Sequence, residues 1–102
     1  MIRIKDIKIR EDLLEEKVLE KAYEKLDYDL MLSLADNYEL VNYNIEALKN
    51  FNLDCIDDLF LNIPYLFLYE KEKITKKLSK YNVAVVSKLI NEDFAAIEDF
   101  LN

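Results

Sequence analysis

Residues 47–67 read ALKNFNLDCIDDLFLNIPYLF and contain the only cysteine and the only proline of the chain. Two other stretches repeat their pattern, residues 22–41 (AYEKLDYDLMLSLADNYELV) and residues 77–97 (KLSKYNVAVVSKLINEDFAAI). When the three windows are placed in register, five columns of apolar residues coincide. These columns are Tyr23, Leu48 and Leu78; Leu26, Phe51 and Tyr81; Tyr28, Leu53 and Val83; Met31, Ile56 and Val86; and Leu34, Leu59 and Leu89. An internal repeat of this length is typical of proteins that stack similar helical units.

Each window is expected to fold as the end of one helix, a short turn and a second helix. Short polar side chains lie at the turn, where they can accept hydrogen bonds from the first amides of the incoming helix. They are Asp27 and Asp29 in the first window, Asn52 and Asp54 in the second, and Asn82 in the third. A two-helix unit cannot bury its apolar face alone, so the units are expected to stack.

The segments between and after the windows predict further helices. Residues 12–26 carry an apolar side chain at every fourth position, which is typical of an amphipathic helix. Residues 91–101 predict a terminal helix, and Pro64 is expected to open a new segment. The predicted fold class is therefore all-α: one domain over residues 1–102, a small bundle or short solenoid of stacked two-helix repeats, with six or seven short helices.

The first 11 residues show neither a clean helical nor a clean strand period. We interpret residues 1–11 as an extended N-terminal arm or a short edge strand. Its isoleucines, which alternate loosely with basic residues, are candidate contacts with a partner chain to which the arm would add or swap. They are Ile2, Ile4, Ile7 and Ile9. Packing of the arm against its own domain explains the same pattern equally well.

The stretch from residue 47 to residue 80 resembles a known repeat. It consists of a leucine, a short turn, a helix with apolar residues three positions apart, a proline and a further leucine. The matching residues are Leu48, Leu53, Ile56, Leu59, Pro64 and Leu66. In this it resembles the repeat of the mitochondrial transcription termination factor family, which stacks such repeats into a curved α-solenoid that binds nucleic acid. The resemblance implies the same architecture and function here. The first and third windows carry Glu39 and Phe94 in place of the proline.

The same stretch is also similar to the helix-hairpin-helix units of DNA repair proteins. In those units the backbone amides of a hairpin that contains glycine contact phosphate, so this resemblance too implies nucleic-acid binding. This chain has Asn50, Phe51 and Asn52 at that place and contains no glycine at all.

The charge balance disfavours nucleic acid as a partner. The chain has 14 basic and 21 acidic residues and a formal net charge of −7, whereas nucleic-acid affinity rests mainly on cancelling phosphate charge. The exception is EKEKITKKLSK, residues 70–80, where Lys73, Lys76, Lys77 and Lys80 fall on one side of a helix. These four lysines are candidate contacts for nucleic acid or an acidic partner, and a solvated helix face is the more common meaning of such a pattern.

The residue types that carry catalysis are scarce. Histidine, the most common general base, is absent. Cys55 occupies the register position of Leu30 and Val85, which are apolar, and is expected to be a buried side chain rather than a nucleophile. Asp54, Asp57 and Asp58 fall within one helical turn and could hold a divalent cation, although a helix cap followed by acidic first-turn residues explains the same spacing better. We therefore expect no catalytic residue, no metal, no cofactor and no enzymatic activity.

The sequence predicts a cytoplasmic protein. No apolar run approaches the length of about 20 residues that a membrane span needs, the start lacks an apolar signal-peptide core, and a single cysteine agrees with a reducing compartment. The function expected is that of a small non-enzymatic helical module that binds another protein or itself. The alternative is nucleic-acid binding through the lysine face.

Overall fold

The computed structural model describes residues 7–101, and every regular element in this range is helical. The α-helices are α1 (Glu16–Lys25), α2 (Tyr28–Asp36), α3 (Tyr38–Asn50), α4 (Ile56–Asn62), α5 (Lys73–Leu78), α6 (Val83–Glu92) and α7 (Ile97–Leu101). Two 3₁₀ helices, η2 (Pro64–Leu68) and η3 (Phe94–Ala96), connect them. The predicted all-α class with six or seven short helices is confirmed.

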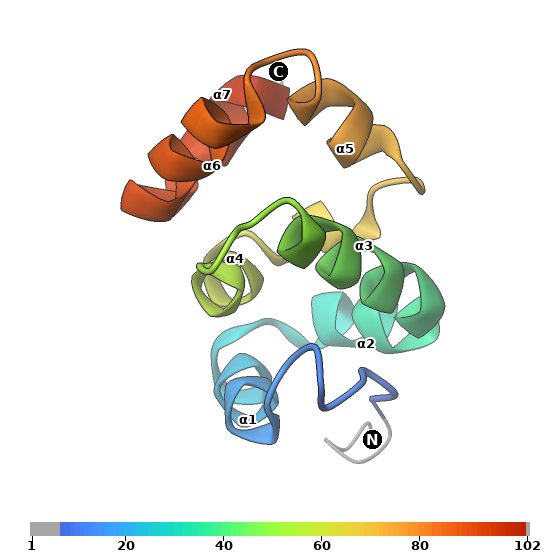
Figure 1. Ribbon diagram of the computed structural model, residues 1–102. Helices are drawn as coiled ribbons and strands as arrows, with labels where there is room; N and C mark the ends of the chain where they lie inside the picture. Colours follow the sequence, from blue (N-terminus) through green and yellow to red (C-terminus); the bar gives the residue numbers. More distant parts are fainter. Residues whose placement is uncertain (1–6, 102) are drawn as a thin grey trace.

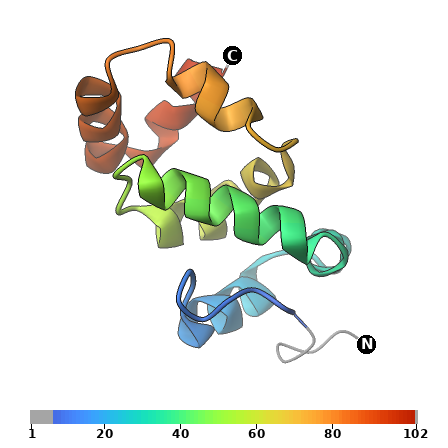
Figure 2. The same cartoon turned by 45° about the vertical axis from the view of Figure 1, so that its right-hand side comes forward.

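The helices form three tiers along the long axis of the molecule (Figure 1). The tier of α1 lies at one end, α2, α3 and α4 form the middle, and α5, α6 and α7 form the other end. Figure 2 shows the longest helix, α3, crossing the middle of the molecule between the first and last tiers. The radius of gyration of 13.2 Å is about that of one compact domain of this length, and the buried side chains of all three tiers belong to one hydrophobic core.

Each of the three windows folds as a helix end, a turn and a second helix, as predicted: α1 and α2, α3 and α4, α5 and α6. In the first and third windows the predicted cap is present. The Asp27 carboxylate accepts from the amide of Leu30 at 2.9 Å, and the Asn82 side chain accepts from the amide of Val85 at 3.2 Å. These bonds satisfy an otherwise unpaired amide at each helix start.

The middle turn is built differently, and the prediction that Asp54 caps α4 is wrong. Asn52 has a φ of 66°, a left-handed conformation that asparagine tolerates better than most residues. The turn therefore runs on for longer, and α4 begins only at Ile56 after Cys55, whose side chain makes no capping bond. The backbone amide of Asp54 donates instead to the side chain of Asn91 at 2.9 Å, which ties this turn to α6.

Helix α1 starts later than the sequence predicts, at Glu16 rather than near residue 12. The amides of Leu13 and Leu14 donate to the carbonyl of Arg10, so residues 11–13 form a turn that leads into the helix. The predicted apolar stripe is confirmed, because Leu14, Val18 and Ala22 are all buried.

Residues 7–10 run in an extended path along α3 and are not a strand. Ile7 and Ile9 are buried in the core of their own domain. The Asn42 side chain holds the segment at two points: its amide donates to the carbonyl of Lys8, and its oxygen accepts from the amide of Arg10, both at 3.0 Å. The described part of the arm thus closes its own domain.

A buried polar contact and an aromatic pair organise the middle tier. Asn44 on α3 is 2% exposed, and its side-chain amide donates to the carbonyls of Phe67 and Tyr69, both at 2.9 Å. Phe60 on α4 packs against Phe67 with ring centroids 5.5 Å apart. Pro64 occupies the start of η2, which confirms the prediction that it opens a new segment.

The predicted terminal helix is divided into two parts. The Asp93 side chain accepts from the amide of Ala95 at 3.2 Å and starts η3, and α7 follows directly. Ile97 and Leu101 are buried, and Phe94 is partly buried against the core, so the apolar face of this segment points inward as expected.

Candidate functional site

The exposed apolar side chains of the described residues gather near one helix. Of the seven large apolar residues that are exposed, four lie between residues 81 and 89. They are Tyr81, Val83, Val85 and Leu89, and together we call them the α6 surface. Single exposed apolar residues are normal on a protein, whereas a local concentration of them is typical of an interaction site.

Helix α6 has an unusual distribution of polar and apolar side chains between its buried and exposed faces. Val86 and Ile90 point into the core. Ser87 is also buried, and its hydroxyl donates to the carbonyl of Val83 at 2.9 Å. Val85 and Leu89, four positions apart and hence on a common face, are 55% and 43% exposed. The helix therefore buries a serine while it exposes a valine and a leucine.

The register of the three windows predicts the opposite for Leu89. Its counterparts Leu34 and Leu59 are completely buried, and Leu89 is not. The reason is its place in the stack: α6 packs chiefly on η3, the segment that follows it, and no further unit within residues 7–101 covers its outer face. The expectation that this apolar column lies in the core is therefore wrong in the third unit.

The other columns do not all behave in this way. Met31, Ile56 and Val86 are buried in all three units. Tyr81, which follows the third helix end, is exposed and packs its ring edge-on against Phe100 at 5.1 Å, while its counterpart Phe51 is buried. Tyr81 and Leu89 are thus exposed where their counterparts in the middle unit are buried, and in the first unit Tyr28 is exposed as well.

The four lysines predicted as one contact face have different surroundings. The Lys77 ammonium donates to the carbonyl of Leu101 at 2.6 Å and is partly buried. The Lys73 ammonium lies 5.1 Å from the centre of the Tyr69 ring, a distance at which a cation is attracted to the face of an aromatic ring. These two lysines stabilise their own domain.

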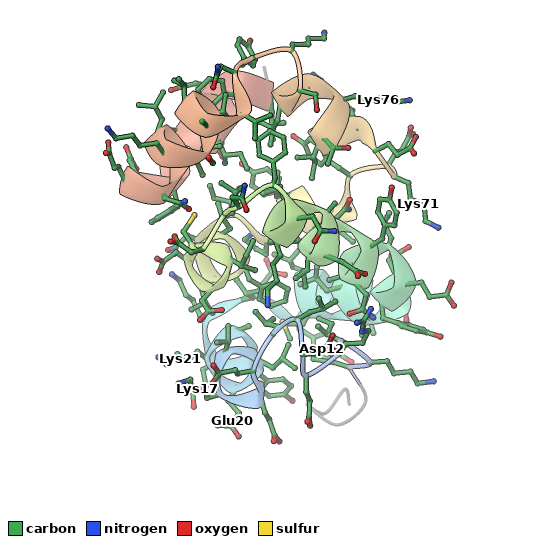
Figure 3. The ribbon with its side chains drawn as sticks, in the orientation of Figure 1. Asp12, Lys17, Glu20, Lys21, Lys71 and Lys76 are labelled. Atoms are coloured by element: carbon green, nitrogen blue, oxygen red, sulfur yellow. The ribbon has the colours of Figure 1, made fainter. Side chains whose placement is uncertain are left out.

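The other two lysines line a common hollow. Lys76 and Lys80 contribute to a shallow surface cavity of about 410 Å³ that is widely open to solvent, and its remaining walls come from Tyr43 of α3 and from Glu72, Thr75 and Ser79 around α5. Lys76 pairs with Glu72 at 3.6 Å, and both side chains are largely exposed. Figure 3 shows Lys76 on the same side of the molecule as Lys71, whose ammonium lies 5.2 Å from the centre of the Tyr43 ring.

The three aspartates of the middle window do not converge on a metal site. No group of three or more acidic or cysteine side chains with metal-binding geometry occurs among the described residues. Asp57 and Asp58 lie in the first turn of α4, where the helix dipole favours negative charge. This placement agrees with the helix-start interpretation of their spacing.

Cys55 is buried, as predicted, and its thiol lies 3.7 Å from the carbonyl oxygen of Ile90. Burial raises the pKa of the Cys55 thiol above its ordinary value, and the carboxylates of Asp54 and Asp58 raise it further. Because the thiolate is the reactive form, this environment is that of an inert structural cysteine.

Cys55 is accordingly expected to react slowly with Ellman's reagent in the native protein. At about pH 8 the rate should be lower by about tenfold or more than in protein unfolded with urea, because reaction requires both opening of the contact with α6 and ionisation of the thiol. Absorbance of the released product measures both rates. Equal rates in the two states would show that the thiol is accessible.

Two asparagines, Asn44 and Asn91, have structural roles that the sequence patterns did not predict. Asn44 lies inside an apolar helix face, and only the pairing of its amide with two carbonyls of η2 and the following residue explains its burial. Asn91 accepts from the amide of Asp54 and donates to the carbonyl of Asn52, so that it ties α6 to the middle turn. A polar residue at an apolar position was the only available signal for Asn44.

The predicted arm contacts lie partly in the described range. Ile7 and Ile9 face the core, so their side chains are not free for a partner chain, and Ile2 and Ile4 lie outside the described residues. Between residues 7 and 101 no helix has the length and apolarity that crossing a membrane requires.

No protein family, curated protein or solved structure that was compared with this chain matches it. The resemblance of residues 47–80 to nucleic-acid-binding repeats therefore stays a prediction.

Proposed function

We propose that the protein is a small non-enzymatic helical module that binds another protein through the α6 surface. The observation that carries this proposal is the exposure of Val85 and Leu89 on a helix whose buried face includes Ser87. Covering apolar side chains gains about 25 cal/mol for each Å² removed from water. A partner segment that packs on α6 would take the place of the next unit in the stack.

The chemistry of the chain supports a binding role rather than catalysis. The one thiol, Cys55, is buried with a raised pKa, and the chain has no histidine to activate it. Catalytic nucleophiles need a neighbouring base or a lowered pKa, and Cys55 has the reverse environment.

The alternative function, nucleic-acid binding through the lysine face, has weaker support. Lys73 and Lys77 are engaged with Tyr69 and Leu101, and Lys76 is paired with Glu72. A phosphate backbone would meet four lysines with different surroundings instead of one continuous basic face.

The proposal is tested by making the α6 surface polar. The double variant V85S/L89S is expected to retain the fold, with a free energy of unfolding within about 0.5–1 kcal/mol of the wild type, because both side chains are largely exposed. Binding should nevertheless fall by about tenfold or more. Affinity capture from a lysate of the source organism, with protein amounts measured by quantitative mass spectrometry, compares the variants.

The matched control is L32S, which makes an exposed leucine on α2 polar at 38% exposure. A protein that is captured by the wild type and by L32S, and lost with V85S/L89S, supports the proposal. Identical sets of captured proteins from all three forms would reject it.

A further inference from the structure

The cavity between α3 and α5 combines cationic and hydroxyl side chains at one place. Thr75 and Lys76 lie on α5, Ser79 and Lys80 follow its end, and Tyr43 faces them from α3. Among residues 7–101 Lys80 has no ion-pair partner, and the only one of Lys76 is Glu72, whose carboxylate is exposed. The cavity therefore offers one ammonium group without an ion-pair partner, that of Lys80, and a second, that of Lys76, for which a ligand would compete with the exposed Glu72 carboxylate.

We propose that this cavity binds the phosphate group of a small phosphorylated ligand. Phosphate oxygens accept hydrogen bonds from ammonium donors, here Lys76 and Lys80, and from the hydroxyl of Ser79, whereas the Thr75 hydroxyl already donates to the Glu72 carbonyl. Bonds to charged donors are about twice as strong as neutral ones. The hollow has a volume of about 410 Å³ and is widely open to solvent, so it can take a phosphate group without enclosing the rest of the ligand. This inference is independent of the α6 surface.

The charge distribution favours a small ligand over a nucleic-acid chain. Residues 70–80 contain five lysines and two glutamates, a net charge of 5 − 2 = +3, so the rest of the chain carries −7 − 3 = −10. Charges in physiological salt are screened beyond about 8 Å. A single phosphate group in the cavity is therefore affected chiefly by the local lysines, while an extended polyanion would also meet the acidic remainder.

The experiment is a ¹H–¹⁵N NMR titration of the full chain with inorganic phosphate and with adenosine 5′-monophosphate, at ionic strength held constant with sodium chloride. Saturable shifts are expected at Thr75, Lys76, Ser79 and Lys80. The variant K76Q/K80Q should lower the affinity by about tenfold or more. The control K17Q/K21Q changes two exposed lysines of α1, at the far end of the molecule from Lys76 (Figure 3), and should bind as the wild type does.

A second variant acts in the opposite direction. Glu72→Gln removes the carboxylate that competes for Lys76 and should raise the affinity about threefold or more. The Thr75 hydroxyl donates to the backbone carbonyl of residue 72, and the substitution leaves this hydrogen bond intact. An increase with Glu72→Gln together with a loss in K76Q/K80Q supports the site.

Three results would overturn the proposal. The first is the absence of saturable shifts around the cavity with either probe. The second is an equal loss of affinity in K17Q/K21Q, which would indicate general attraction to surface lysines. The third is binding of a single-stranded oligonucleotide about tenfold or more tighter than the mononucleotide, which would assign the lysines to an extended polyanion.

Discussion

Replacement of Phe60 by alanine should lower the free energy of unfolding by about 3–5 kcal/mol. Phe60 is completely buried on α4 and packs against Phe67 of η2, where the middle tier meets the rest of the core. Removal of its ring takes away apolar burial and leaves a cavity that the surrounding helices can fill only in part. Urea denaturation followed by circular dichroism measures the change.

The control for this variant is Leu32→Ala on α2, where the side chain is exposed. Its cost should stay within about 0.5–1 kcal/mol. A loss below about 1 kcal/mol for Phe60→Ala would contradict the packing of α4 against η2.

Replacement of Asn44 by leucine should lower the free energy of unfolding by about 2–4 kcal/mol, although leucine is more apolar. The Asn44 amide donates to the carbonyls of Phe67 and Tyr69 in a buried place, and leaving a buried acceptor unpaired costs about 1–3 kcal/mol. The same denaturation experiment reports the change, and hydrogen exchange should show faster opening of residues 64–69.

Asn50 provides a matched control on the same helix, because it is exposed at the end of α3 and forms no side-chain hydrogen bond in the described structure. Asn50→Leu should change the stability by less than about 0.5–1 kcal/mol. If Asn44→Leu were as stable as the wild type, the bridge from α3 to the segment after α4 would have no energetic importance.

The all-α fold was predictable because local chemistry and pattern agree. Apolar positions recur with a helical period, and short polar residues such as Asp27 and Asn82 mark the helix starts, where they accept from helix amides as expected. Such signals depend on neighbours in the sequence, so they can be recognised without knowledge of the tertiary structure.

The middle turn could not be predicted in the same way. Asp54 looks like a cap by its spacing, but the left-handed Asn52 lengthens the turn and Asn91 takes the Asp54 amide. The position of Asn91 depends on how α6 packs on that turn. A contact between residues that lie far apart in the sequence therefore decided this detail.

The exposure of the α6 surface could not be predicted from the sequence, for a related reason. The repeat register assigns Leu89 the environment of Leu34 and Leu59, and this is correct only where another unit covers the column. A sequence pattern records which side chains are apolar and does not record which face lacks a neighbour. The exposed positions of Val85 and Leu89 therefore required the structure.

The most direct test of the account is site-specific photo-crosslinking in living cells of the source organism. A photoreactive benzoylphenylalanine is placed at Leu89 on the α6 surface or, as the control, at Leu32 on α2. We expect a crosslinked protein partner from position 89 and none from position 32. No crosslink from position 89, or the same products from both positions, would contradict the proposal that the α6 surface serves a partner.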